Sequence, residues 1–212
     1  MKISYEFYPP KDSNYNKVVE EFLLLEKYNP RFISITYGAM GGSQDRSIDL
    51  IKTFKEKTEI DIVAHLTMVG KSKTDLIKII NDFKSLGINK IVALRGDSPE
   101  GKFKAHPDGF FNTSDFVKFL SDLNIETFVS AYPEPHPDSK DFDFDIKLLN
   151  EKTNAGANQS ITQFCFSNSN FQRLINEITI KKIKNEITAG IMPIYNIKSL
   201  ANMAARCGID IP

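Results

Sequence analysis

Seven apolar runs recur along this chain at a roughly regular spacing, and amphipathic stretches separate them. The runs are Ile3–Phe7, Phe32–Thr36, Ile62–Thr67, Lys90–Leu94, Thr127–Ala131, Ser160–Phe166 and Ile187–Ile194. Alternation of strand-like and helix-like segments is typical of a parallel sheet wrapped by helices. The pattern therefore predicts an α/β fold of the parallel β/α barrel type.

Four of the separating stretches carry apolar residues at helical spacing on one side and charged residues on the other. They are Asn14–Tyr28, Ser72–Leu86, Thr113–Leu123 and Asn170–Ile180. Thr113 or Ser114 is the expected N-cap of the third stretch. Apolar stripes of this kind pack against a sheet, so we expect these helices to cover the strands.

The number of strand–helix units limits the domain organisation. A complete (β/α)8 TIM barrel takes about 250 residues, whereas this chain has 212 and seven countable units. A missing unit would leave unpaired edges on the first and seventh strands, so either the chain is a fragment or another element closes the sheet. We expect a single barrel domain over residues 1–212 from which one or more C-terminal units are missing.

Charge and hydropathy narrow the class of partner. The chain has 27 Lys and Arg residues against 27 Asp and Glu residues, a balance that gives no field favouring nucleic acid or a membrane surface. No apolar stretch approaches the ~20 residues of a membrane span. Met1 leads almost at once into a strand-like run, which leaves no room for a signal peptide. We expect small-molecule partners and a cytoplasmic location.

No metal site is expected. The three histidines lie on different predicted loops and lack close acidic neighbours at metal-ligand spacing. Cys165 and Cys207 are too few for a disulfide scaffold, and we expect both to be buried small apolar residues. The chain also lacks a nucleophile elbow, a P-loop and a dinucleotide fingerprint. An organic cofactor suits the remaining polar residues better than a metal.

Six strand-like runs end in a polar or charged residue, and such positions form the active site of a parallel barrel. In a β/α barrel the carboxyl ends of all strands meet at one face, so residues distant in sequence converge there. These residues are Glu6, Thr36, His65, Asp97, Tyr132 and Gln163.

Glu6 is the strongest catalytic candidate among them. It stands between aromatic residues on a strand that is expected to be buried. Burial disfavours the charged form of a carboxyl group, which is how a glutamate becomes a general acid near neutral pH. A salt-bridged strand end is the alternative interpretation.

The segment Arg95-Gly96-Asp97 places a glycine between a cation and a carboxylate at the predicted barrel mouth. Glycine allows a ligand to approach the backbone closely, Arg95 could hold a phosphate, and Asp97 could bond the edge of a polar heterocycle. A structural ion pair between loops is the alternative. His65 is either a satisfied core histidine or, from its place near a strand end, a ligand contact. His136 lies on a proline-rich loop that would hold its side chain in place.

Seven segments, taken in order, resemble bacterial methylenetetrahydrofolate reductases. They are Tyr5-Glu6-Phe7-Tyr8-Pro9-Pro10, Ser34-Ile35-Thr36-Tyr37-Gly38-Ala39, Ala64-His65-Leu66-Thr67, Ala93-Leu94-Arg95-Gly96-Asp97, Ala131-Tyr132-Pro133-Glu134, Asn154-Ala155-Gly156-Ala157-Asn158 and Ile161-Thr162-Gln163-Phe164. The resemblance runs from Ile3 to Pro212, and a series of matched segments is more specific than any one motif.

The resemblance implies a (β/α)8 flavoprotein that binds FAD at the carboxyl ends of its strands. NADH or NADPH would reduce the flavin and leave, and 5,10-methylenetetrahydrofolate would then take a hydride and become 5-methyltetrahydrofolate. This ping-pong order lets one pocket serve two large substrates. The resemblance leaves the choice of donor and the oligomeric state open, and a homo-oligomer is possible within the family.

The resemblance also implies roles for individual residues. Glu6 matches the acid that protonates the folate so that its five-membered ring opens, and Gln163 matches a residue that bonds the pterin. Asp97 matches a carboxylate that lies near the pyrimidine end of the flavin and also reaches the pterin. The positions implied to contact FAD are Thr36, His65, Arg95, Gly96, Asp97, Thr113, Tyr132, His136, Asp145 and Lys152. Glu151 departs from the pattern, since some relatives have a basic residue there.

Two other functions fit the residues. One is a barrel enzyme that acts on another folate-linked or corrinoid-linked one-carbon unit. The other is a non-catalytic flavin- or folate-binding module, although simple binding would not require an acid such as Glu6 beside the pterin.

Overall fold

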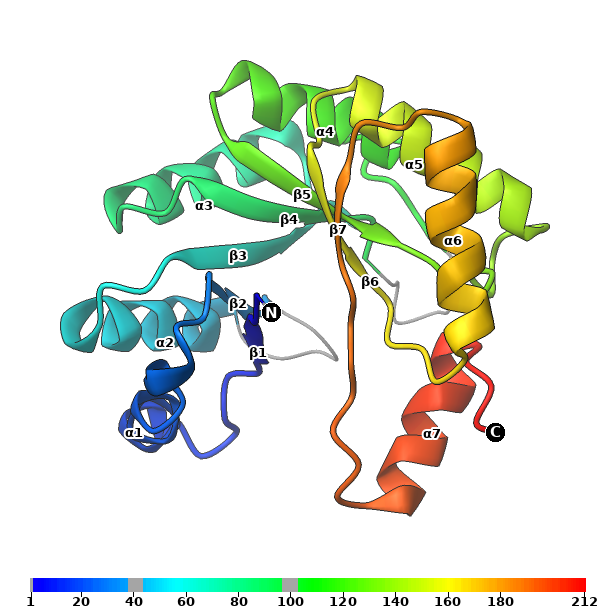
Figure 1. The fold of residues 1–212 in the computed structure, drawn as a ribbon. Helices are drawn as coiled ribbons and strands as arrows, with labels where there is room; N and C mark the ends of the chain where they lie inside the picture. The colour runs from blue at the N-terminus through cyan, green and yellow to red at the C-terminus, as the bar shows by residue number, and fades with distance from the viewer. Residues whose placement is uncertain (1, 38–43, 97–102) are drawn as a thin grey trace. The chain divides into compact units, whose positions relative to one another are not determined.

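The computed structural model of the protein describes residues 2–37, 44–96 and 103–212. Its strands alternate with helices along the chain (Figure 1) and form a seven-stranded sheet in the order β1-β2-β3-β4-β5-β6-β7. The strands are β1 (Tyr5–Phe7), β2 (Ile33–Ile35), β3 (Ile62–Thr67), β4 (Lys90–Leu94), β5 (Glu126–Ala131), β6 (Gln159–Thr162) and β7 (Glu186–Thr188). The helices are α1 (Tyr15–Leu23), the short 3-10 helix η1 (Glu26–Tyr28), α2 (Gln44–Lys57), α3 (Lys73–Ser85), α4 (Thr113–Asp122), α5 (Phe142–Asn154), α6 (Asn168–Ile180) and α7 (Ile197–Cys207).

This is the alternation of a (β/α)8 barrel with seven units, so the predicted fold class is confirmed. The chain divides into two compact units. The first comprises Met1–Phe116 with Asn124–Glu126, and the second comprises Val117–Leu123 with Thr127–Pro212.

In the first unit, aromatic side chains of β1 pack against α1 and α2. The rings of Tyr5 and Phe7 contact Phe22 of α1 edge-on, with centroid distances of 6.5 and 6.1 Å. The ring centroids of Phe7 and Phe22 each lie 5.4 Å from the ring centroid of Phe54 of α2. Because side chains alternate along a strand, Glu6 points to the sheet face opposite these two helices.

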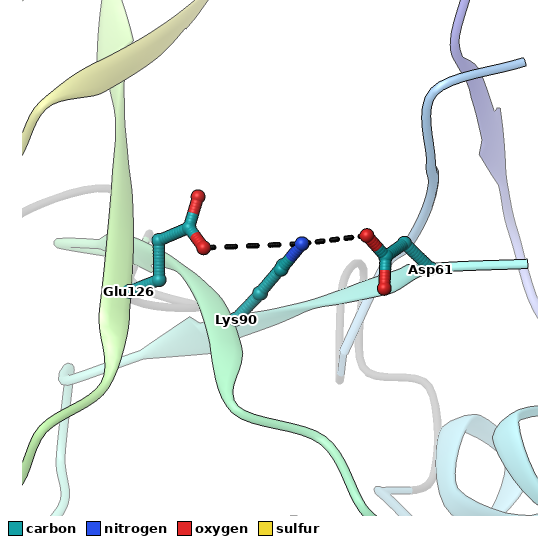
Figure 2. Close-up of polar contacts among 3 residues, drawn as sticks. All are labelled: Asp61, Lys90 and Glu126. Carbon is teal, nitrogen blue, oxygen red and sulfur yellow. Dashed lines mark hydrogen bonds and ion pairs between the residues drawn. The ribbon is translucent and has the colours of Figure 1, made fainter.

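An ion-pair chain in the first unit joins three residues that lie at the amino ends of β3, β4 and β5 (Figure 2). The ammonium group of Lys90, at the start of β4, lies 2.6 Å from Asp61 Oδ2 and 3.8 Å from Glu126 Oε2. Asp61 directly precedes β3, and Glu126 begins β5. The amino ends of barrel strands lie away from the active face, so this chain of charges is a feature of stability.

In the second unit, α7 packs against the segment that follows β6. Leu200 and Ala204 of α7 form a buried cluster with Phe164 and Ile209. The helix ends at Gly208, whose φ of +67° is a left-handed conformation that suits glycine. Ile209, after the end of the helix, therefore packs beside the residues that precede α6.

Several predicted boundaries are wrong. β6 ends at Thr162 and not at Phe166, and β7 covers Glu186–Thr188 and not Ile187–Ile194. Residues 189–194 include a glycine and a proline, which weaken strand pairing, and Ile191 is 84% exposed. The N-cap of α4 is Asn112 and neither Thr113 nor Ser114, because the Asp115 amide donates to Asn112 Oδ1 at 2.8 Å.

The cysteines and the helices test two further expectations. Cys165 and Cys207 are free but only half-buried, so the prediction that both are buried is wrong. No helix in the described part of the chain is long and apolar enough to cross a membrane.

Candidate active site

The parallel register of the first unit places several polar residues on one face of the sheet. Glu6 pairs with Ser34, Ser34 pairs with Val63, and His65 lies two residues further along β3. Side chains two residues apart share a face. Glu6, Ser34 and His65 therefore share the face that lies opposite α1 and α2.

Glu6 itself is exposed, so the prediction of a buried carboxyl group is wrong. The reason is the alternation along β1, which gives the helix-covered face to Tyr5 and Phe7. The carboxylate is nevertheless close enough to His65 for its charge to favour the protonated imidazole. The structure thus brings these two predicted site residues together.

His65 is 7% exposed, and its Nε2 has no hydrogen-bond partner among the described residues. Burial lowers the pKa of His65 below its ordinary value, and the charge of Glu6 only partly opposes this effect. A buried ring nitrogen without a partner is costly unless a ligand satisfies it. The structure therefore does not support the alternative of a satisfied core histidine.

The loops after β2 and β4 hold three further predicted residues. The Thr36 hydroxyl donates to the Phe7 carbonyl at 3.1 Å, which ties the ends of β1 and β2 together. Gly96 has a φ of +81°, and a Cβ there would lie 2.7 Å from Val69 Cγ1, so the turn requires glycine. The Arg95 guanidinium lies 5.6 Å from the ring centroid of Phe103.

Two more predicted positions belong to this part of the chain. Thr113 is partly buried and begins α4. Asp97 lies outside the described residues, as do Gly38 and Ala39 of the second matched segment.

In the second unit, the loop after β5 carries Tyr132 and His136 in contact with each other. Their rings meet edge-on with centroids 5.0 Å apart. The backbone amide of His136 donates to Asp145 Oδ2 at 2.9 Å, and the Ser139 hydroxyl donates to Asp145 Oδ1. Asp145 is buried on α5, so its carboxylate anchors this loop to the helix.

Lys152 lies on the same helix and is 7% exposed. Its ammonium group donates to the carbonyl oxygen of Ser130 on β5 at 2.7 Å. Burial lowers the pKa of Lys152 to about 8, although the carboxylate of Asp145 opposes the shift. An anion that binds beside this buried ammonium group would stabilise its charge in place of the water that burial removes.

Gln163 directly follows β6. Its backbone N–H donates to the Ala131 carbonyl at 2.9 Å. This bond continues the register that pairs Ala131 with Thr162. Gln163 is therefore next in register to Tyr132, and the second unit brings these two predicted residues together. The side-chain oxygen of Gln163 accepts from the Phe164 amide at 3.0 Å.

Sequence reasoning assigned no role to Glu134, although this residue ends one of the matched segments. It is 5% exposed and accepts from the Asp210 amide at 2.9 Å and from the Cys165 thiol at 3.4 Å. Burial is the main reason why the pKa of Cys165 is raised. A carboxyl group between two prolines in an otherwise apolar segment is the sequence signal that could have drawn attention to it.

No group of three or more His, Cys, Asp or Glu side chains suited to a metal ion occurs within residues 2–37, 44–96 and 103–212. In the first unit, the described polar residues offer the cation of Arg95 and the imidazole of His65. In the second unit, they offer the cation of Lys152 with Tyr132, His136 and the amide of Gln163. Each set contains a cation and hydrogen-bonding groups of the kind that bind an organic ligand carrying phosphate.

Comparison with known proteins identifies the family. The family described as "Methylenetetrahydrofolate reductase" matches residues 1–212 of this chain. The chain belongs to the methylenetetrahydrofolate reductase family. The resemblance found in the sequence is thereby confirmed, and the chain is a member of an enzyme family.

Curated relatives within this family match the whole chain. The 5,10-methylenetetrahydrofolate reductase of Pectobacterium carotovorum is 36% identical to this chain over an alignment of 214 positions. The alignment covers 100% of this chain and 70% of that protein. The enzyme of the same name from Escherichia coli is also 36% identical, with 71% of its length covered. "Methylenetetrahydrofolate reductase (NADH) 1" of Arabidopsis thaliana is 30% identical over 224 residues, covering 99% of this chain and 38% of that protein.

Solved structures agree on the fold. A mutant of the tryptophan synthase alpha-subunit from Pyrococcus furiosus matches with a TM-score of 0.60 and 14% identity over 97% of this chain and 84% of that chain. A second mutant of the same subunit gives a TM-score of 0.62 at 12% identity, with the same coverage. At this identity the likeness shows the barrel fold alone.

Proposed function

We propose that this protein reduces 5,10-methylenetetrahydrofolate to 5-methyltetrahydrofolate, with FAD as cofactor and NADH or NADPH as electron donor. The observation that carries the proposal is the family match over all 212 residues, together with bacterial relatives named 5,10-methylenetetrahydrofolate reductase. The polar residues at the strand ends of both units support it.

The described residues fit FAD. In the first unit, Nε2 of His65 is buried without a hydrogen-bond partner among the described residues, so a cofactor that reaches this face would satisfy it. Gly96 lacks a side chain, which lets the loop after β4 pack closely against Thr67 and Val69. In the first unit, Arg95 is the cation that would meet the cofactor's charge, with Thr36 and Thr113 as further contacts. In the second unit, Lys152 is that cation, Tyr132 and His136 would contact the cofactor, and Asp145 would hold the backbone of His136. When bound, FAD supplies the hydride-transfer chemistry that no side chain can provide.

The protein's own catalytic contribution is a proton. Ring opening of the substrate breaks the bond between N10 and the bridging methylene carbon, and N10 must take a proton as it leaves. In the proposal, Glu6 gives that proton, and the methylene carbon receives a hydride to become the methyl group. One proton and one hydride thus account for the conversion. By the family resemblance, Gln163 and Asp97 are the residues proposed to bond the pterin.

Replacement of Glu6 by Gln tests this assignment. The change keeps the size and polarity of the side chain but removes its acid. We expect reduction of the flavin by NADH to stay within about twofold of the unmodified protein, while reduction of methylenetetrahydrofolate falls by at least about a hundredfold, in line with general acid catalysis.

The two half-reactions are measured separately by anaerobic stopped-flow absorbance of the flavin. Glu20→Gln, at an exposed position on α1, is the matched control and should affect neither. Equal loss in both half-reactions would refute the acid role of Glu6. An unmodified protein that retains no FAD after desalting would refute the flavoprotein proposal as a whole.

A further inference from the structure

The loop after β5 is held from several sides, and Glu134 joins it to segments that lie far along the chain. Oε2 of Glu134 accepts the Asp210 amide at 2.9 Å across 76 residues, and Oε1 accepts the Cys165 thiol at 3.4 Å across 31 residues. Because a buried carboxyl group is costly unless it is hydrogen-bonded, these contacts fix where Glu134 lies. Glu134 stands between Tyr132 and His136, the two loop residues assigned to the cofactor.

The C-terminal segment Gly208–Asp210 packs directly on this loop. A Cβ at Gly208 would lie 3.0 Å from Pro137 Cγ and 3.8 Å from the Pro135 carbonyl oxygen. Ile209 is buried with Phe164 in the cluster that seats α7. The segment is therefore fixed, and its Asp210 amide is a rigid donor for Glu134.

Other contacts hold the loop but do not involve Glu134. The Arg173 guanidinium of α6 donates to the Pro133 carbonyl at 3.2 Å and stacks on the Phe142 ring, 4.0 Å from its centroid. Asp145 holds the His136 amide from α5. Glu134 accepts a hydrogen bond that joins the C-terminal segment to this arrangement.

We propose that Glu134 is a positioning residue, through which the segment Gly208–Asp210 orients Tyr132 and His136 for cofactor binding. The inference rests on the proposed function, because it assigns these two side chains to FAD. A hydrogen bond that a carboxylate accepts is stronger than one between neutral groups. A displacement of about 1 Å in a binding group is enough to weaken a site.

The test removes the backbone N–H of residue 210, which donates to Glu134. Asp210→Pro deletes the amide donor to Glu134, whereas Asp210→Ala changes the same exposed side chain and keeps the donor. In the full chain, the dissociation constant for FAD is measured by quenching of flavin fluorescence. The visible circular dichroism of the bound flavin reports its orientation, and thermal unfolding of the apoprotein reports stability.

We expect Asp210→Ala to match the unmodified protein. Asp210→Pro should weaken FAD binding by about tenfold or more and should change the visible circular dichroism at temperatures well below unfolding. A lower unfolding temperature with unchanged affinity and spectrum would mean that the contact is only structural, and it would overturn the proposal.

A second pair of variants decides the matter if Asp210→Pro does not fold. Glu134→Gln keeps an oxygen that can accept the Asp210 amide, and Glu134→Ala does not. FAD affinity that is lost in Glu134→Ala and restored in Glu134→Gln supports positioning, whereas equal affinity in the two refutes it. An unmodified chain that binds no FAD overturns this inference together with the proposed function, while flavin binding that is insensitive to all these changes overturns the inference alone.

Discussion

Lys152 offers a test of how burial controls charge in this protein. Its pKa falls from 10.5 to about 8 in the folded state because the ammonium group is buried. Below pH 8 the lysine is protonated whether the chain is folded or unfolded. Between pH 8 and 10.5 the unfolded chain keeps a proton that the folded chain has released, so the free energy of unfolding rises with pH in this window.

The size of this rise in the free energy of unfolding follows from the change in the pKa of Lys152. At about 1.4 kcal/mol per pKa unit, a fall from 10.5 to about 8 corresponds to roughly 3 kcal/mol. Lys152→Met removes the titrating group, and the variant should lack this rise. The stability of the unmodified protein relative to Lys152→Met should therefore increase by roughly 3 kcal/mol from about pH 7 to pH 10.5.

Urea unfolding followed by far-ultraviolet circular dichroism, repeated across this pH range, measures the difference. Lys147→Met is the matched control, because Lys147 lies on the same helix with a side chain that is 70% exposed. This control should follow the unmodified protein at every pH. Parallel curves for Lys152→Met and the unmodified protein would refute the reasoning, because they would mean that the Ser130 carbonyl and Asp145 fully compensate for burial.

Two other changes test the first unit. Lys90→Met removes the ammonium group that contacts Asp61 and Glu126 and should cost about 1 kcal/mol in urea unfolding at low salt. The cost should be smaller at high salt because ions screen partly exposed charges; no change at low salt would contradict this. Gly96→Ala should destabilise by about 2–4 kcal/mol, since it adds a clash to a left-handed backbone. Gly70→Ala, with φ +65° and nothing within 4 Å, should cost only about 1 kcal/mol in the same assay, and equal costs at both glycines would rule out the clash.

The strands could be predicted because burial on both faces leaves a continuous apolar run. Ile62–Thr67 and Lys90–Leu94 coincide with β3 and β4. The end of the sheet was harder to predict, because Ile191 and Ile194 continue the apolar pattern after β7 although both are exposed. The hydropathy of a segment shows that its residues are apolar. It does not show whether a neighbouring strand is there to pair with that segment.

The candidate site shows a similar limit. The position of Glu6 on β1 followed from the sequence, but its exposure did not, because which face of a short strand is covered depends on α1 and α2. The burial of Lys152 could not be predicted either. A lysine near the end of an amphipathic helix usually reaches solvent, whereas this one finds the Ser130 carbonyl at 2.7 Å.

Asp145 shows why a matched position does not by itself define a role. Its two carboxylate oxygens are engaged by the His136 amide and the Ser139 hydroxyl. A buried carboxylate would repel the phosphates of a dinucleotide, yet the same group holds the backbone from which His136 projects. If FAD binds as proposed, the contribution of Asp145 passes through the loop. Glu134 contributes in the same way from the opposite end of that loop, so two buried acids would support a site that neither of them needs to touch.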